Sequence, residues 1–99
     1  MPFTRLNEFR AKPGRGPALR AFLTSVITDV RAAPGCRACD LYEALDNPEH
    51  FAVIEIWDTV EAHKAAGRAI APSRIEEAMT LLEVPATGTY YRPVTNADA

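Results

Sequence analysis

Trp57 and His63 are the two residues of this sequence whose types and spacing most directly suggest chemistry. Trp57 is the only tryptophan in the 99-residue chain, and His63 follows it on a predicted helix. An imidazole with an ordinary pKa of about 6.5 can take up a proton at neutral pH, and an indole offers a large apolar face for an aromatic ring. The pair therefore predicts a site that holds an aromatic compound and removes a proton from it. A core tryptophan and a surface histidine would give the same pattern.

Further polar side chains on predicted strands are candidates to point inward beside this pair. These residues are Arg5, Asn7, Tyr42, Glu55, Tyr90 and Tyr91. For each of them, a solvated or interfacial position is the competing interpretation.

The sequence lacks the common motifs of nucleotide, zinc-protease and serine-hydrolase chemistry. Cys36, Cys39, His50 and His63 are its only cysteines and histidines, and their spacing matches no common structural zinc site. Cys36 and Cys39 have the spacing of a redox pair, but side chains three residues apart on a strand point to opposite faces. We therefore expect neither a metal nor a redox disulfide.

Length and composition are typical of one globular domain. The 99 residues allow a single core, and 47% hydrophobic with 24% charged residues is close to the globular average. A net charge of -2 gives no electrostatic reason to bind nucleic acid or an anionic membrane. No run of uncharged residues approaches the roughly 20 that a membrane span needs, and the first residues lack the apolar core of a secretory signal. We therefore expect a cytoplasmic protein.

Hydrophobic spacing and turn signals predict the elements that would position these residues. Residues 3–11 alternate and read as a strand, and the apolar stripe from Leu19 to Val30 predicts a helix that Pro17 opens and Pro34-Gly35 ends. Strands over 36–45 and 50–57 form a hairpin with its tip at residues 46–49.

The remaining elements complete an α+β fold. Asp58 and Glu61 are a plausible capping pair for a short second helix, and Pro72 begins a third helix with Ile75, Met79 and Leu82 on one face. Residues 87–94 read as a last strand, which gives a domain over residues 1–94 and a tail over 95–99. This order predicts a ferredoxin-like split βαβ fold with an antiparallel sheet.

The strand over residues 50–57 is apolar on both faces. Phe51, Val53 and Trp57 face one way, and Ala52, Ile54 and Ile56 the other. The chain's own helices can cover one face, but the second would remain a large exposed apolar patch. The sequence therefore predicts a homodimer.

An ordered set of short motifs resembles the antibiotic biosynthesis monooxygenase domain family. The set consists of Pro34-Gly35-Cys36, Asp40-Leu41-Tyr42, Asp46-Asn47-Pro48, Phe51, Glu55-Ile56-Trp57 and Glu61-Ala62-His63. The resemblance runs from the first strand to Tyr91, and it implies a dimeric α+β barrel in which two ferredoxin-like folds pack sheet to sheet.

This resemblance also implies an activity and a set of site residues. Family members of known activity oxidise phenols or hydroquinones with O2 and use neither metal nor flavin, so no cofactor is expected. Trp57 matches the tryptophan that lines the pocket in quinone-forming members, and His63 lies where they carry a tyrosine and could handle the proton. Those two are the implied catalytic residues, and the implied substrate-binding residues are Asn7, Tyr42, Glu55 and Arg74.

The sequence departs from the family pattern at two polar positions. Val53 replaces an asparagine, and Glu77 lies near the position of an arginine for which Arg74 is the nearest substitute. A haem-degrading branch of the family also has an asparagine where Asn7 stands, but its tryptophan and histidine positions fall near Ala66 and Glu76, which leaves no axial ligand.

We therefore expect a cofactor-independent monooxygenase that acts on a small phenolic or hydroquinone-like metabolite. Two alternatives remain open from the sequence. One is a non-enzymatic, dimeric small-molecule-binding module, and the other is an isomerase-type acid/base enzyme on the same barrel.

Overall fold

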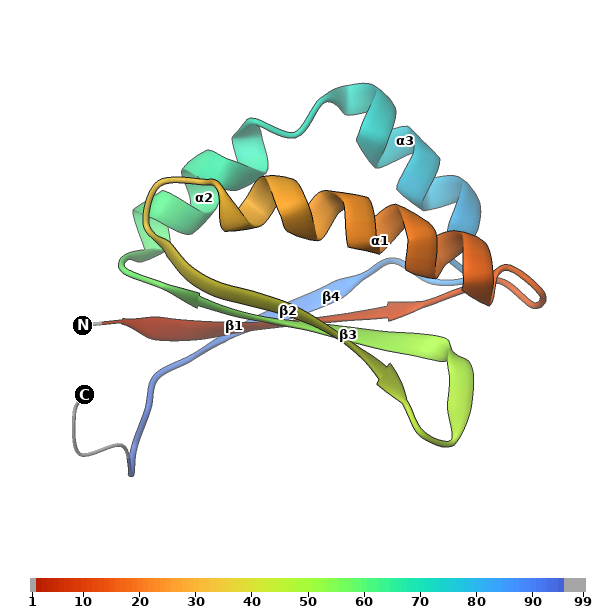
Figure 1. Ribbon diagram of the computed structural model, residues 1–99, viewed down its shortest axis with the longest axis horizontal. Coiled ribbons are helices and arrows are strands. Elements are labelled where there is room, and N and C mark those ends of the chain that lie inside the picture. Colours follow the sequence, from red (N-terminus) through yellow and green to blue (C-terminus); the bar gives the residue numbers. More distant parts are fainter. Residues whose placement is uncertain (1, 96–99) are drawn as a thin grey trace.

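The computed structural model describes residues 2–95 and has a four-stranded antiparallel sheet with three helices on one of its faces (Figure 1). The elements in chain order are β1 (Phe3–Arg10), α1 (Gly16–Arg31), β2 (Cys36–Ala44), β3 (Asn47–Trp57), α2 (Val60–Arg68), α3 (Pro72–Leu81) and β4 (Thr87–Tyr91). The strand order is β2-β3-β1-β4. This arrangement confirms the predicted ferredoxin-like α+β fold.

Helix α1 packs against the sheet through the predicted apolar stripe. Leu19, Phe22, Leu23 and Ile27 are buried, and Pro17 occupies the first turn, where its missing N–H costs no hydrogen bond. Gly35, after the helix, has a φ of 85°, a conformation that favours glycine. The helix is therefore anchored along its length and forms one wall of the space above the sheet.

Helices α2 and α3 are held much more loosely than α1. Helix α2 has no buried residue, and Leu81 is the only one in α3. The predicted face of α3 does not fill a core, because Ile75 is 48% and Met79 is 66% exposed. Figure 1 shows the two helices as an arch above the sheet beside α1. Together with α1 and the sheet they enclose a cavity of about 590 Å³.

Three local predictions are corrected by the structure. The hairpin turns at residues 45–46, and β3 already begins at Asn47, because Ala44 pairs with Asn47 after a register shift. Thr59, not Asp58, caps α2 by accepting a hydrogen bond from the Ala62 N–H at 3.1 Å. The Asp58 carboxylate instead pairs with Arg37.

The structure also bears on the last strand, the predicted C-terminal tail and the question of a membrane span. The last strand ends at Tyr91, three residues before the predicted end. The predicted boundary between a domain and a tail stays a prediction, because residues 96–99 of the tail lie outside the described residues. Within residues 2–95, none of the helices combines the length and the apolar character that crossing a membrane would require.

Candidate active site

Strand register brings polar side chains from three strands together beneath the helices. Arg5 on β1 lies opposite Glu55 on β3 and Tyr90 on β4, while Asn7 lies opposite Val53 and Gly88. Residues directly opposite each other in an antiparallel pair share a face, and Glu55 shares its face with the buried Phe51, Val53 and Trp57. Arg5, Asn7, Glu55 and Tyr90 therefore all stand on the helix-facing side of the sheet.

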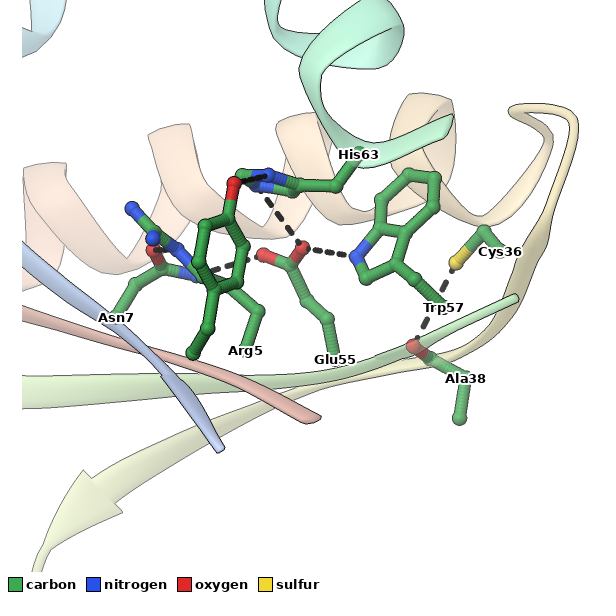
Figure 2. A network of polar contacts seen from close by, with 8 residues as sticks. Arg5, Asn7, Cys36, Ala38, Glu55, Trp57 and His63 are labelled. Atoms are coloured by element: carbon green, nitrogen blue, oxygen red, sulfur yellow. Dashed lines mark hydrogen bonds and ion pairs between the residues drawn. The ribbon is translucent and has the colours of Figure 1, made fainter. Parts of the chain in front are cut away.

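Glu55 is the centre of this polar group and the only buried charged residue among those described, with 7% of its surface exposed. Its Oε1 accepts a hydrogen bond from Trp57 Nε1–H at 2.6 Å, and its Oε2 accepts one from Asn7 Nδ2–H at 2.7 Å. Arg5 Nε–H donates to Asn7 Oδ1 at 2.9 Å and so orients that amide (Figure 2). The carboxyl group is thus fixed by one donor on each oxygen.

Burial raises the pKa of Glu55 above its usual value. Desolvation is the largest cause, and the hydrogen bond from Trp57, the charge of Arg5 and the hydrogen bond from Asn7 oppose it. The carboxylate is therefore a stronger base than an exposed glutamate, and both of its oxygens accept hydrogen bonds.

His63 extends from the first turn of α2 toward the same carboxyl group. Its Nε2 lies 3.9 Å from Glu55 Oε1, which is too long for a hydrogen bond, and its Nδ1 lies 2.8 Å from the Tyr90 hydroxyl. The ring meets Trp57 edge to face, with centroids 5.4 Å apart. Figure 2 shows His63 above Glu55, with Trp57 to one side.

The surroundings of His63 lower its pKa below the usual value. Desolvation is the larger cause, and the positive charge of Arg5 acts in the same direction. At neutral pH the imidazole is therefore uncharged and can accept a proton.

A cavity of about 590 Å³ lies between the sheet and the three helices. Asn7, Glu55, Trp57 and His63 line it at the Trp57 end of β3. Most of the remaining lining is apolar and includes Phe9, Phe22, Leu23, Ile75, Met79 and Leu82. The cavity can therefore hold an apolar compound whose polar group faces His63 and Glu55.

Arg74 also lines this cavity but makes its contacts with α1. Its Nη2 donates to Ser25 Oγ at 2.9 Å, its Nη1 lies 3.5 Å from Asp29 Oδ2, and the guanidinium lies 5.5 Å from the centroid of the Phe22 ring. Arg74 thus ties α3 to α1 along the cavity wall. The structure does not bring it into contact with the group around Glu55.

Tyr42 is the predicted site residue that the structure places elsewhere. It pairs with Ala52 and therefore lies on the sheet face opposite the helices, where it is 52% exposed. Tyr91, which pairs with Thr4, faces the same way and is 50% exposed. The strand alternation that turns Glu55 inward turns Tyr42 outward, so Tyr42 cannot bind a compound in this cavity.

Arg5 and Tyr90 belong to this group; the sequence made both of them candidates to point inward, but it did not place them among the expected catalytic or substrate-binding residues. What identifies them as part of the group is their strand pairing: Arg5 lies opposite Glu55, and Tyr90 lies opposite Arg5. This pairing depends on the strand register, which the sequence alone does not supply for β4.

Neither cysteine has the low thiol pKa of a reactive cysteine. Burial raises the pKa of Cys39 to about 12 and also raises that of Cys36, so neither is a ready thiolate. Within residues 2–95, no three His, Cys, Asp or Glu side chains are grouped so that they could hold a metal ion.

Comparison with known proteins identifies the family. The model of the antibiotic biosynthesis monooxygenase family matches residues 2–69. The chain belongs to this family. That match contains β1 to α2, and therefore Asn7, Glu55, Trp57 and His63, but it does not reach Arg74 or Tyr90.

Individual relatives of the family agree with this assignment. The chain is 44% identical over 48 residues to "Putative monooxygenase Rv0793" of Mycobacterium tuberculosis, a match that spans 48% of each protein. It thus covers about half the length of the curated relative it matches. The solved structure of Rv0793 superposes with a TM-score of 0.84 at 29% identity, over 98% of this chain and 99% of that one.

Two more distant structures show the same fold. PA3566 from Pseudomonas aeruginosa has a TM-score of 0.80 at 24% identity, over 94% of this chain and 95% of that one. SnoaB from Streptomyces nogalater, described as a cofactor-independent oxygenase, has a TM-score of 0.81 at 14% identity, over 99% of this chain and 98% of that one.

Proposed function

We propose that this protein is a cofactor-independent monooxygenase that oxidises a phenolic or hydroquinone-like compound with O2. The observation that carries the proposal is the position of His63 Nε2 and Glu55 Oε1, 3.9 Å apart, at one end of a largely apolar cavity. Membership of the family supports it, as does the fold shared with SnoaB, a cofactor-independent oxygenase.

The size of the cavity favours a substrate larger than a single ring. An apolar cavity of roughly 150 Å³ is enough to hold benzene, whereas this one measures about 590 Å³. We expect the hydroxylated ring to lie beside Trp57 and His63 and the rest of the molecule to extend toward Phe9 and Leu82. Two-ring phenols such as 1-naphthol are therefore suitable probes.

Proton removal is the step for which the site provides a base. A phenol hydroxyl in the cavity donates its proton to Nε2 of the uncharged His63, which leaves a phenolate and an imidazolium. The Glu55 carboxylate, 3.9 Å from Nε2, stabilises the imidazolium. Since phenolates give up an electron far more readily than phenols, this step prepares the substrate for O2.

The oxidation itself balances without another reductant. The phenolate passes one electron to O2, and the phenoxyl radical and superoxide combine at the para carbon. The peroxide takes the proton from His63 and becomes a hydroperoxide. Loss of the para C–H proton and cleavage of the O–O bond then give a quinone and water. One phenol and one O2 are thus converted into one quinone and one H2O.

Isotope labelling tests this proposal directly. With 1-naphthol and 18O2, we expect a quinone that carries one 18O atom and no stoichiometric H2O2. His63→Ala should lower kcat by about 100-fold or more, the usual contribution of a general base. Equal rates in the wild type and His63→Ala would remove His63 from the mechanism, and H2O2 with unlabelled quinone would refute monooxygenation.

The apolar side chain of Val53 is a reason to test, in the same experiment, whether the protein binds a small molecule without catalysing a reaction. It is packed in the core cluster with Ile27 and Cys39, so it offers the cavity no polar group where the family pattern has an asparagine. A non-enzymatic module would be stabilised by 1-naphthol without consuming O2. An isomerase would likewise consume no O2, but it would convert a lactone or aldehyde substrate.

We also propose that two copies pack through the sheet face opposite the helices. Tyr42, Ile56 and Tyr91 on that face are 52%, 37% and 50% exposed, and Ile54 and Leu6 lie between them. Figure 1 shows all three helices on the other side of the sheet, so no element of residues 2–95 covers these side chains. Sedimentation should give a dimer at micromolar concentration, and a stable folded monomer would contradict this proposal.

A further inference from the structure

The Tyr90 hydroxyl contacts the ring nitrogen of His63 that is farther from Glu55. It is 2.8 Å from Nδ1, whereas Nε2 is the ring nitrogen near the cavity-lining Glu55. Tyr90 itself is not part of the cavity lining. The ring nitrogen that can meet a ligand is therefore Nε2, and Tyr90 controls the other one.

Two contacts fix the Tyr90 ring in this position. Phe3 meets it edge to face with centroids 5.1 Å apart, and the Arg5 guanidinium lies 4.6 Å from its centroid. These contacts join the edge strand β4 to β1 and keep the hydroxyl aimed at α2. Because Tyr90 is already held, its hydrogen bond can restrain His63 with little further loss of conformational freedom.

We propose that Tyr90 is a positioning residue whose hydroxyl pairs with Nδ1 of His63 in either protonation pattern of the ring, so that Nε2 can act as donor or acceptor toward the cavity. This inference rests on the proposed function for its catalytic meaning. Its structural content, the pairing of Tyr90 with His63, does not depend on any reaction.

A hydroxyl suits this task because it can both donate and accept a hydrogen bond. With no ligand bound, the Glu55 carboxylate favours a proton on the nearby Nε2, and Tyr90 then donates to the bare Nδ1. When a phenol donates to Nε2, the ring proton must be on Nδ1, and the Tyr90 oxygen accepts it. In the imidazolium, Tyr90 accepts from Nδ1–H while Glu55 faces Nε2–H.

The charges around His63 define the pH dependence that this arrangement predicts. Glu55 faces the ring from β3, Arg5 is nearby on β1, Tyr90 contacts it from β4, and the uncharged Trp57 packs against it. A hydrogen bond from a cation is stronger than one between neutral groups. Loss of the Tyr90 oxygen should therefore cost the imidazolium more than the neutral ring and lower the pKa of His63.

The experiment compares Tyr90→Phe with Tyr91→Phe, the same change at the neighbouring residue on the opposite sheet face. NMR titration of the His63 ring should give a lower pKa in Tyr90→Phe than in the wild type and an unchanged one in Tyr91→Phe. In the reaction, Tyr90→Phe should lower kcat on the order of tenfold with little change in KM. The acid limb of its pH profile should move to lower pH.

Wild-type measurements keep the test independent of any variant's folding. Ring 15N shifts should place the proton of neutral His63 on Nε2 in the free protein and on Nδ1 after binding of 4-methyl-1-naphthol, a phenol with a blocked para position. An unchanged pKa of His63 in Tyr90→Phe, or no movement of the ring proton on binding, would overturn the inference. If the NMR results hold but the wild type consumes no O2, the pairing stands and the proposed oxygenase function fails.

Discussion

Replacing Gly88 by alanine is a perturbation that should act on His63 without touching it. Gly88 lies on β4 opposite Asn7, and a Cβ built on it would overlap the Arg5 guanidinium. Its φ is not positive, so its backbone tolerates alanine. The flexible end of Arg5 is the part that must move. Gly88→Ala should therefore displace this guanidinium and leave the rest of the fold in place.

Two contacts would be lost in Gly88→Ala. The Arg5 hydrogen bond to Asn7, at 2.9 Å, contributes about 1 kcal/mol in a half-buried position. The contact of the Arg5 guanidinium with Tyr90 contributes about 0.5–1 kcal/mol. Alanine offsets about 0.4–1 kcal/mol of this by restricting the unfolded chain. The net loss is about 0.5–1.5 kcal/mol, and each kcal/mol lowers Tm by about 4–8 °C in a domain of this size.

The pKa of His63 is the second quantity that should change. Arg5 is one of the two causes that lower this pKa, the larger being burial. Moving the guanidinium away should therefore raise the pKa of His63, and it should also raise the pKa of Glu55 further, since Arg5 opposes its increase. NMR titration of the His63 ring measures the first effect directly.

A double-mutant cycle with Arg5→Ala separates this mechanism from general damage to β4. In the Arg5→Ala background no guanidinium stands in the way, so Gly88→Ala should be neutral or slightly stabilising. The pKa of His63 should likewise no longer respond to it. Equal losses of Tm in both backgrounds would refute the reasoning.

Four further perturbations test other parts of the structure. The pKa of Glu55 is higher in the folded state than in the unfolded state. The free energy of unfolding of the wild type should therefore fall as pH rises from the usual carboxyl pKa to the raised one. Urea unfolding of Glu55→Gln should not show this pH dependence. Trp57→Phe removes a donor to Glu55 and should cost about 1–3 kcal/mol in the same assay. Ala66→Leu should weaken binding of 1-naphthol more than of phenol in calorimetry, because Ala66 lines the cavity. Ile56→Asp should give a monomer by sedimentation, and an intact dimer would exclude this face as the interface.

The elements could be predicted from the sequence because each rests on local physics. The stripe on α1 has one orientation that buries Leu19, Phe22 and Leu23 together, and the alternation along β3 fixes which side chains face the helices. That alternation also explains why the sequence could place Glu55 and Trp57 on one face of this strand. Both lie on the same face of one strand as the buried Phe51.

Residues on other strands were harder to place because their orientation depends on register. Tyr42 was expected in the site, but its pairing with Ala52 turns it to the other face. Tyr90 is opposite Arg5 only in the observed pairing of β4, and a shift of one residue would have turned Tyr91 inward instead. The prediction that Asp58 caps α2 was wrong for a similar reason. The Asp58 carboxylate forms an ion pair with Arg37 on β2, a contact between distant residues that no local sequence pattern reveals.

Glu55 and the cavity together are the strongest structural argument that this domain does more than fold. A buried carboxylate costs stability even when it is hydrogen-bonded, and an apolar residue of similar size often serves a core as well or better. Here two donors and a nearby guanidinium are arranged to hold that group beside an unfilled space, under helices that bury almost nothing of their own. Such a departure from efficient packing is typical of a binding or catalytic site, and it supports the proposal that a compound enters the cavity.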